Sequence, residues 1–552
     1  MGASGAGKTT LMNVLTARRP GKLKITGDVR VNGSKMGRNI SRVAGYVQQE
    51  ELFIPSMTTR EHLIFHAMLR MNKDMTKEQR LLRVEEVLDF LNLKKVEKTL
   101  IGTPGRIKGL SGGEKRRLTF ASEPTSGLDS SMAFIISDAM RKLANQGKTI
   151  VCTIHQPSSE IFQLFDTLYL LAEGRLAYFG LRTKAQEFFG RLDYTPPEKY
   201  NPSDYYIQTL AILPYDREAC LERVEYICDE YERSPMYSQR VAEVQQFHAI
   251  EDDQTISGLF KSSPKYKAGF FTQLRWLMWR SFKNMVKNPF ELRLHLILAV
   301  IVGVMLGLLF IRLKYNQQAP QNMSSVIFVL LINISFTYLK AVANSYAREY
   351  PVFFKEHDDN IYRTFPYYIS RFLIELPVFA LGTFILATIV YWLTNLYDNV
   401  RRYFILMGIL ILTELVATSA GSIIAVISPT FQVADALVVP IVIPLMVFGG
   451  FFINAKTIPK WLIWIKYISW FYYGNEMALV NQWTDVKYLQ CNRKANSNTT
   501  CFRDGNDVLK LYGFSKTHYN RDLGLLFVLF ISFRLISLTI LALKAKYQRS
   551  SA

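Results

Sequence analysis

The 552-residue sequence has few cysteines and a shortage of acidic residues relative to basic ones. Its five cysteines show no spacing typical of a zinc site, so a zinc-binding domain is excluded. The first residues lack the charged region and apolar core of a signal peptide, so we expect the first membrane helix to direct insertion. The 66 basic and 46 acidic residues give a net charge of +20. Such a charge would suggest that the protein binds nucleic acid only if the basic residues formed a stripe on a soluble fold.

The basic residues crowd beside hydrophobic segments instead. This arrangement is typical of a cytoplasmic flank that faces anionic lipid, so we expect membrane lipid as a partner and no nucleic acid. The flank before the first hydrophobic segment contains Lys261, Lys265, Lys267, Arg275, Arg280, Lys283, Lys287 and Arg293.

Apolar residues make up 49% of the chain and are concentrated after about residue 290, in runs long enough to cross a bilayer. We therefore expect one soluble part and one membrane part. An even number of spans places both ends on one side, and the basic flanks predict that this side is cytosolic, although Arg401 and Arg402 break the rule locally. The six predicted spans cover about residues 292–311, 326–346, 372–392, 403–427, 433–453 and 523–543.

A phosphate-binding loop stands at the beginning of the chain. Residues 2–9 read Gly-Ala-Ser-Gly-Ala-Gly-Lys-Thr, the pattern of a P-loop that opens a helix. Small residues let backbone N–H groups close around phosphates, Lys8 reaches the terminal phosphates and Thr9 ligates magnesium. The alternative is a glycine-rich turn without a ligand, and the loop alone does not separate kinases, GTPases and transport ATPases. The predicted ATP and Mg²⁺ site contains Gly2, Ser4, Gly5, Ala6, Gly7, Lys8, Thr9 and Thr10.

Four further motifs follow in order, and with them the sequence resembles the ATP-binding-cassette family. Gln49 matches the family's Q-loop glutamine, which contacts magnesium and the membrane domain. Residues 126–129, Ser-Gly-Leu-Asp, match the D-loop that ends in Asp129, and His155 matches the switch histidine near the γ-phosphate. The signature sequence is matched by Leu110, Ser111, Gly112, Gly113 and Glu114. The resemblance implies that this signature holds the γ-phosphate of ATP bound to a second subunit, so that a dimer is obligatory.

The resemblance narrows to the White type of half-transporter in the G subfamily. It rests on residues 46–71, YVQQEELFIPSMTTREHLIFHAMLRM, on residues 102–123, GTPGRIKGLSGGEKRRLTFASE, and on Asn-Pro-Ser-Asp at 201–204. The implied fold is an incomplete α/β P-loop ATPase domain at 1–198, a linker at 199–268 and an all-α, six-helix ABC-2 type membrane domain at 269–552. The implied location is the plasma membrane or a pigment-granule membrane, with the ATPase domain in the cytosol.

The sequence departs from the family pattern in two places. Relatives have further strands before the P-loop, so we interpret Met1 as an internal position of a longer product. The family also has an apolar strand ending in Asp-Glu before Pro-Thr-Ser-Gly-Leu-Asp, whereas here Ser122-Glu123 leads directly into Pro124. Glu123 is the candidate catalytic base, but it aligns equally well with the glutamate that ends the family's signature helix, and no aspartate stands directly before it. Two interpretations stay open: a shortened copy of an active ATPase, which we favour, or a subunit with an impaired ATP site whose Ser111 completes a partner's site.

Three regions outside the spans have expected features of their own. Residues 199–264 are polar and predict a linker with a helix around 220–233, where Cys220 and Cys228 are reduced thiols. Residues 270–286 are amphipathic, which suits a helix on the membrane surface or an ordinary docking helix. The loop after the fifth span contains Cys491, Cys501 and the glycosylation acceptor Asn498. Its predicted outer location favours an intrachain disulfide and a glycan.

The resemblance also indicates a cavity between two subunits for a small-molecule substrate. Glu414, in the middle of the fourth span, is costly in lipid and is expected to face protein or this cavity. The predicted cavity residues are Asn333, Phe336, Ile443, Met446, Phe451 and Phe452, and the alternative for each is plain helix packing. Aromatic and sulfur side chains there would hold a flat ligand.

The expected function is ATP-dependent export of a small apolar or aromatic substrate, such as an eye-pigment precursor, with a second half-transporter. The alternatives are sterol or lipid export by a homodimer and a non-hydrolysing partner subunit. A P-loop switch protein with a membrane anchor is disfavoured, because an anchor needs one helix and not six.

Overall fold

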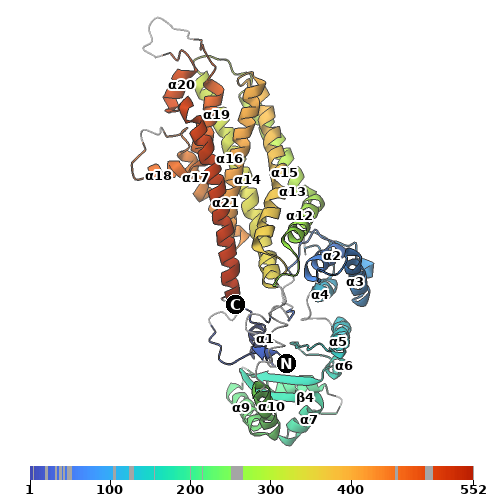
Figure 1. The fold of residues 1–552 in the computed structure, drawn as a ribbon. Helices are drawn as coiled ribbons and strands as arrows, with labels where there is room; N and C mark the ends of the chain where they lie inside the picture. The colour runs from blue at the N-terminus through green and yellow to red at the C-terminus, as the bar shows by residue number, and fades with distance from the viewer. Residues whose placement is uncertain are drawn as a thin grey trace. The chain divides into compact units, whose positions relative to one another are not determined.

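A computed structural model describes residues 1–3, 5–18, 23–31, 34–35, 40, 44–46, 52–103, 107–122, 130–154, 156–198, 200–213, 216–249, 265–453, 458–490 and 501–550. The chain forms two compact units, which are drawn together in Figure 1. The first consists of Met1–Trp276, Lys355–Arg363 and Ala545–Ala552, and the second of Leu277–Phe354 and Thr364–Lys544.

The first unit is built mainly from short helices. Its elements are α1 (Lys8–Leu15), β1 (Arg30–Val31), β2 (Ser34–Lys35), α2 (Thr59–Arg70), α3 (Lys77–Phe90), η2 (Lys94–Val96), α4 (Gly112–Ser122), α5 (Ser130–Asn145), α6 (Ser159–Gln163), β3 (Thr167–Ala172), β4 (Arg175–Leu181), α7 (Arg182–Arg191), α8 (Pro202–Thr209), α9 (Arg217–Arg233) and α10 (Pro235–Ala249).

Local sequence signals fix where several of these helices begin. Thr58 and Glu61 form a capping box at α2, since Thr58 N–H donates to Glu61 Oε2 at 3.0 Å and Glu61 N–H donates to Thr58 Oγ1 at 3.3 Å. Thr76 and Gln79 form the same box at α3. A capping box satisfies backbone donors that the first turn leaves without partners, so it stabilises the helix start.

The β3–β4 hairpin forms the core of the second half of this unit. Its turn uses Glu173 and Gly174, both at positive φ, as a tight two-residue hairpin requires. Helices α7, α8 and α9 cover it through buried aromatic residues that include Phe189, Tyr206 and Tyr231. Residues 202–249, assigned by the sequence to a linker, therefore contribute helices to a packed core.

The sheets formed by the described residues are both antiparallel pairs, β1–β2 and β3–β4. The parallel sheet that an α/β P-loop domain implies is not found in that part of the chain. Residues 149–154 read Thr-Ile-Val-Cys-Thr-Ile, a composition typical of a strand, yet they pair with no described segment and Val151 is 56% exposed. This strand-like segment has no paired neighbour among the described residues. That agrees with the sequence, in which the family's apolar strand before Pro124 is missing.

The second unit is a helical bundle. Including α12, which crosses between the units, its elements are α12 (Phe270–Lys287), α13 (Pro289–Leu309), α14 (Ala319–Asp358), α15 (Thr364–Thr394), α16 (Val400–Ile427), α17 (Phe431–Val447), α18 (Ile463–Ile468), α19 (Trp470–Trp483), α20 (Gly505–Tyr512), η3 (Lys516–His518) and α21 (Tyr519–Ser550). Within the described residues, four helices are long and apolar enough to cross a membrane: α14, α15, α16 and the helix at Lys516–Tyr547. The first and fifth predicted spans lie on shorter apolar helices, Arg293–Leu309 and Phe431–Val447.

Small residues allow close contacts between helices of the bundle. Gly303 and Gly307 of α13 lie against Ile389 and Leu393 of α15, and a Cβ on Gly307 would come within 2.5 Å of Leu393. This small-xxx-small spacing lets two membrane helices approach closely. The predicted fifth span extends to residue 453, whereas α17 ends at Val447, before Gly450 adopts a φ of +80° that a continuing helix does not allow.

Candidate functional site

The P-loop has the backbone that its glycines predict. Gly2, Gly5 and Gly7 have φ of 148°, 88° and 89°, and a Cβ on Gly2 would lie 2.2 Å from the carbonyl oxygen of Leu171. Helix α1 begins immediately afterwards at Lys8, and no described side chain caps it. Its first N–H groups are thus available to an anion, which is the arrangement that P-loops use for phosphate.

Lys8 lies over the P-loop, where it is predicted to contact the phosphates. The side chain is buried, and its Nζ donates to the carbonyl oxygens of Gly2 at 2.8 Å and Ala3 at 2.6 Å. Burial lowers the pKa of Lys8, because it disfavours the charged form. A phosphate at this loop would offer the ammonium a full negative charge in place of two carbonyl dipoles. Ala6 is buried beside it, whereas Gly5, Thr9 and Thr10 are exposed.

The signature sequence begins a second helix. Ser111 N–H donates to Glu114 Oε2 at 2.8 Å, and Glu114 N–H donates to Ser111 Oγ at 3.3 Å, which is a capping box at α4. Gly112 is exposed and nothing lies within 4 Å of the position of its missing Cβ, while Gly113 is half-buried. Ser111 and Glu114 therefore hold the helix start in shape and leave its glycine backbone open.

Several predicted site residues lie outside the described residues: Ser4, Gln49, Glu123, Asp129, His155, Cys491 and Asn498. Their roles stay predictions. Cys501 is disulfide-bonded, while Cys152, Cys220 and Cys228 are free thiols. Burial raises the pKa of Cys152 to about 11, so this thiol stays protonated at neutral pH.

The Asn-Pro-Ser-Asp motif packs against Pro157, two positions after the predicted switch histidine, His155. Asn201 Nδ2 donates to the carbonyl oxygen of Pro157 at 2.7 Å, and Ser203 Oγ donates to the same oxygen at 3.1 Å. Asn201 also caps α8, with Pro202 in its first turn. The motif thus ties helix α8 to the chain two residues after His155.

Sequence reasoning missed a polar cluster around the Lys355–Arg363 segment, which belongs to the first compact unit although it contains the last turn of α14 and the connection to α15. Arg18 Nη2 donates to Asp359 Oδ1 at 2.5 Å, and His66 Nε2 lies 3.9 Å from Glu356 Oε1. An available signal was the acidic group Glu356, Asp358 and Asp359 in a flank that is otherwise basic. These contacts join the end of α1 and helix α2 to the connection between two membrane helices.

The predicted cavity residues lie on helix faces that this chain leaves partly open. On α14 the less buried positions recur every three or four residues, at Ser325, Val329, Asn333, Phe336 and Lys340, and so form one stripe.

On α17 the stripe Ala434, Val438 and Val442 is buried, Ile443 is 42% exposed and Met446 is half-buried. Asp435 links α17 to α14 by accepting from Asn344 Nδ2 at 2.9 Å and lying 3.1 Å from Lys340 Nζ.

An aromatic cluster follows α17. Phe328 stacks on Phe451 with ring centroids 4.9 Å apart, and Phe452 meets Phe328 edge-on at 5.5 Å. Phe328 is buried, whereas Phe452 is 57% exposed. The cluster therefore combines a buried ring, Phe328, with an exposed ring, Phe452. Such an arrangement can stack against a flat molecule.

Glu414 faces protein, not lipid. It is 1% exposed in the middle of α16, and its Oε2 accepts a hydrogen bond from Thr383 Oγ1 of α15 at 2.5 Å.

Replacing Thr383 by valine, of nearly the same shape, should lower the melting temperature of the detergent-purified protein. A buried acceptor left without its partner costs about 1–3 kcal/mol. The matched control is Ser532→Ala, which removes an exposed hydroxyl that bonds only to its own helix. Equal melting temperatures for the two variants would show that the hydrogen bond between Thr383 and Glu414 contributes nothing to the stability of the protein.

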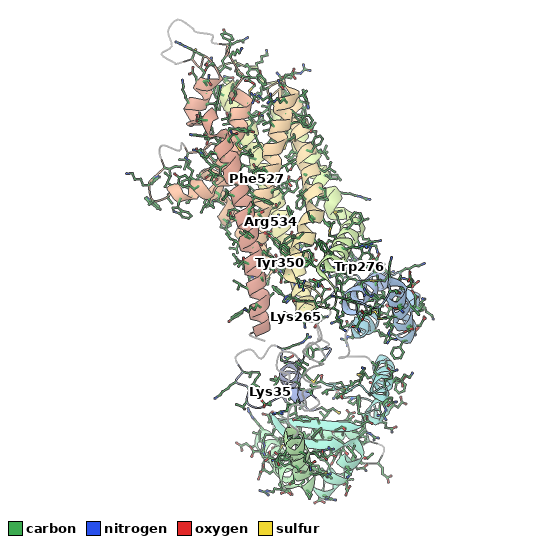
Figure 2. The ribbon with its side chains drawn as sticks, in the orientation of Figure 1. Lys35, Lys265, Trp276, Tyr350, Phe527 and Arg534 are labelled. Carbon is green, nitrogen blue, oxygen red and sulfur yellow. The ribbon has the colours of Figure 1, made fainter. Side chains whose placement is uncertain are left out.

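A second charged residue in the bundle escaped the sequence reasoning. Figure 2 labels Arg534 about halfway along α21. Its guanidinium lies 4.3 Å from the centroid of the Phe372 ring, and its Nη2 donates to Thr418 Oγ1 at 3.3 Å. A lone arginine inside an apolar run is itself a signal of a specific partner, and here the partners are aromatic faces.

Family models match both parts of the chain. The model described as ABC transporter matches residues 1–124, and two models described as ABC-2 type transporter match residues 155–226 and 272–483. The chain is 38% identical to Protein white of Drosophila melanogaster, over 99% of this chain and 81% of that protein. It is 32% identical to Protein scarlet of the same organism, over 97% and 82% of the two chains. It is also 32% identical to the broad substrate specificity ATP-binding cassette transporter ABCG2 of Mus musculus, over 91% and 80%.

Proposed function

Because the chain belongs to the ABC transporter family, among the White and G-type half-transporters, we propose that it exports a small apolar or aromatic molecule as half of an ATP-driven dimer. ATP and Mg²⁺ bind at the P-loop through Lys8 and Thr9. The signature at Ser111 completes the ATP site of the second subunit, and that subunit completes this chain's site in return.

One observation carries this proposal: Lys8 is held over a positive-φ glycine loop at an uncapped helix start, in the same chain as a bundle of apolar helices. The loop accounts for nucleotide binding and the bundle for the membrane. The partly open stripe on α14 and the exposed Ile443 of α17 further support a second subunit, since they leave apolar or amide side chains for a partner to cover.

The ATP site lacks one component in this sequence. No aspartate stands directly before Glu123, so we infer that the carboxylate expected to hold Mg²⁺ through water is missing from this sequence. We propose that hydrolysis depends on a longer product of the gene, in which Glu123 is the base and His155 lies near the γ-phosphate. The second possibility is a non-hydrolysing subunit that lends Ser111 to its partner, which the intact capping box at α4 favours.

For the substrate we favour a flat aromatic compound of the pigment-precursor type over a sterol. The exposed Phe452 ring and the Phe336 face of α14 provide stacking surfaces. The mouse relative is named for its broad substrate specificity, which agrees with a cavity of aromatic and sulfur side chains, because such side chains adapt to ligands of differing shape. Whether the membrane is that of the cell surface or of a granule is tested by locating the tagged protein.

Substituting Phe336 by alanine should raise the concentration of labelled tryptophan or guanine needed for half-maximal ATP-dependent uptake by roughly twofold to tenfold. This range corresponds to the loss of one stacking contact of about 0.5–1.5 kcal/mol. Uptake is measured in inside-out vesicles that contain the chain and a second half-transporter of the family. Phe527→Ala, an exposed ring on α21, is the control and should change nothing. Uptake of labelled cholesterol but of neither aromatic compound would favour the sterol alternative.

A further inference from the structure

A cavity of about 570 Å³ lies where the ends of α13 and α15 meet the segment after α19. Its lining includes Arg312, Lys314, Trp392, Asn395, Tyr488 and Gln490, all within the second unit. Since α15 starts directly after the Lys355–Arg363 connection and ends at Thr394, the predicted topology places this cavity on the non-cytosolic side. It is separate from the nucleotide site and from the aromatic cluster after α17.

Backbone hydrogen bonds from three segments fix the walls of this cavity. Arg312 N–H donates to the carbonyl oxygen of Leu393 at 3.0 Å, and Leu313 N–H donates to that of Thr394 at 3.1 Å. Gln490 N–H closes the third side by donating to the carbonyl oxygen of Tyr315 at 3.2 Å.

These bonds hold Arg312 at a φ of +48° and Asn395 at +58°. Residues with a long side chain rarely adopt positive φ. The segments around Arg312 therefore hold its backbone in this unusual conformation.

The cavity contains two cations with no acidic partner among the described residues. Neither Arg312 nor Lys314 forms an ion pair there, although both are exposed. Arg402, which is also on the predicted outer side, behaves differently, because its Nε donates to Asp485 Oδ2 at 3.0 Å. Basic residues are depleted on the outer side of membrane proteins, so a pair of them in one cavity without a counterion leaves room for an anion from outside the chain.

The uncharged lining residues indicate which anion fits. Trp392 and Tyr488 are 51% and 72% exposed, and such aromatic side chains are typical of the headgroup level of a bilayer. Asn395 and Gln490 add amide donors, although Asn395 already donates to the carbonyl oxygen of Leu313 at 3.4 Å. Arginine binds a phosphate through two parallel bonds, and lysine adds a point charge.

We propose that this cavity binds the phosphate group of a molecule with a net negative charge at the outer face of the membrane. The anion comes either from the headgroup of an anionic phospholipid or from a soluble organic phosphate. The two cations neutralise the phosphate, the amides bond its remaining oxygens or the adjoining glycerol, and Trp392 packs beside the first carbons of the molecule. If the anion is a lipid headgroup, the site would attach the loops after α13 and α15 to the bilayer. If the anion is soluble, the same loops would bind it. Neither role depends on which substrate is exported.

The test is native mass spectrometry of the full chain, purified in neutral detergent and titrated with phosphatidylglycerol, phosphatidylcholine or glycerol 1-phosphate. We expect the unmodified chain to bind phosphatidylglycerol at a concentration at least fivefold lower than phosphatidylcholine. The double variant Arg312→Gln/Lys314→Gln should lose this preference. Arg401→Gln removes another exposed basic residue on the same side, outside the cavity, and should keep it.

Each outcome bears on the proposal. Displacement of phosphatidylglycerol by glycerol 1-phosphate at similar concentration identifies a soluble anion as an equal source, whereas resistance to it identifies the lipid. No preference in the unmodified chain, or an equal loss in Arg401→Gln, overturns the site. The melting temperature of each variant shows whether it is folded. Because the substituted positions are exposed, the glutamines should leave the melting temperatures unchanged.

Discussion

Replacing Lys8 by methionine should reduce ATP-dependent uptake by about 100-fold or more in vesicles that contain a second half-transporter and the longer form of the chain, in which an apolar strand ending in aspartate precedes Glu123. The Lys8 ammonium lies within 2.8 Å of two P-loop carbonyl oxygens, so a phosphate bound at this loop would be in direct reach of the charge. Removing one preorganised donor from a site where charge develops typically costs 10²–10³ in rate. Methionine keeps the length of the side chain, which limits the effect to the lost charge.

Two measurements accompany this prediction. Photolabelling with an azido-ATP analogue should fall in parallel with uptake, whereas Lys142→Met, on the exposed side of α5, should change neither. If Lys8→Met leaves uptake intact while Ser111→Arg abolishes it, this chain's own ATP site is idle and its signature serves the partner. That pattern would contradict the reciprocal mechanism and support the non-hydrolysing subunit.

The parts of the structure that the sequence predicted best are those with local causes. The P-loop glycines Gly5 and Gly7 have positive φ, a backbone that glycine adopts more readily than other residues, and α1 begins at Lys8, inside the motif that is expected to open a helix. The long helices α14, α15 and α16 follow from apolar runs whose length matches a bilayer. Glu414 faces a protein hydroxyl because burying its carboxyl group in lipid would cost more.

The parts that escaped prediction depend on contacts between distant segments. Arg18 and Asp359 pair across 341 residues of sequence, and no local pattern announces such a pair. Helices α8 to α10 looked like a polar linker because only a few of their positions, such as Tyr206, Val224 and Tyr231, are buried, and those are buried against the β3–β4 hairpin. The cavity lined by Arg312, Trp392 and Gln490 is likewise invisible to pattern reasoning, since three segments far apart in the sequence supply its walls.

Inserting an apolar strand that ends in aspartate between Ser122 and Glu123 should raise vanadate-sensitive ATP hydrolysis by about 100-fold or more over the unmodified chain. General base catalysis is worth about 10²–10⁴ in rate, and it requires both the carboxylate of Glu123 in place and Mg²⁺ held by the new aspartate. The insertion should also raise the melting temperature, because residues 149–154 gain a neighbour. Each buried strand side chain contributes about 1.5–3 kcal/mol.

A second insertion, identical except that it ends in asparagine, separates structure from chemistry. It should raise the melting temperature as much as the first and restore little hydrolysis, since asparagine brings the strand but no negative charge for Mg²⁺. An unmodified chain that already hydrolyses ATP at the rate of the aspartate variant would contradict this account. If instead both insertions stabilise the chain and neither hydrolyses ATP, Glu123 is not the base, and it corresponds to the glutamate that ends the signature helix α4 in relatives.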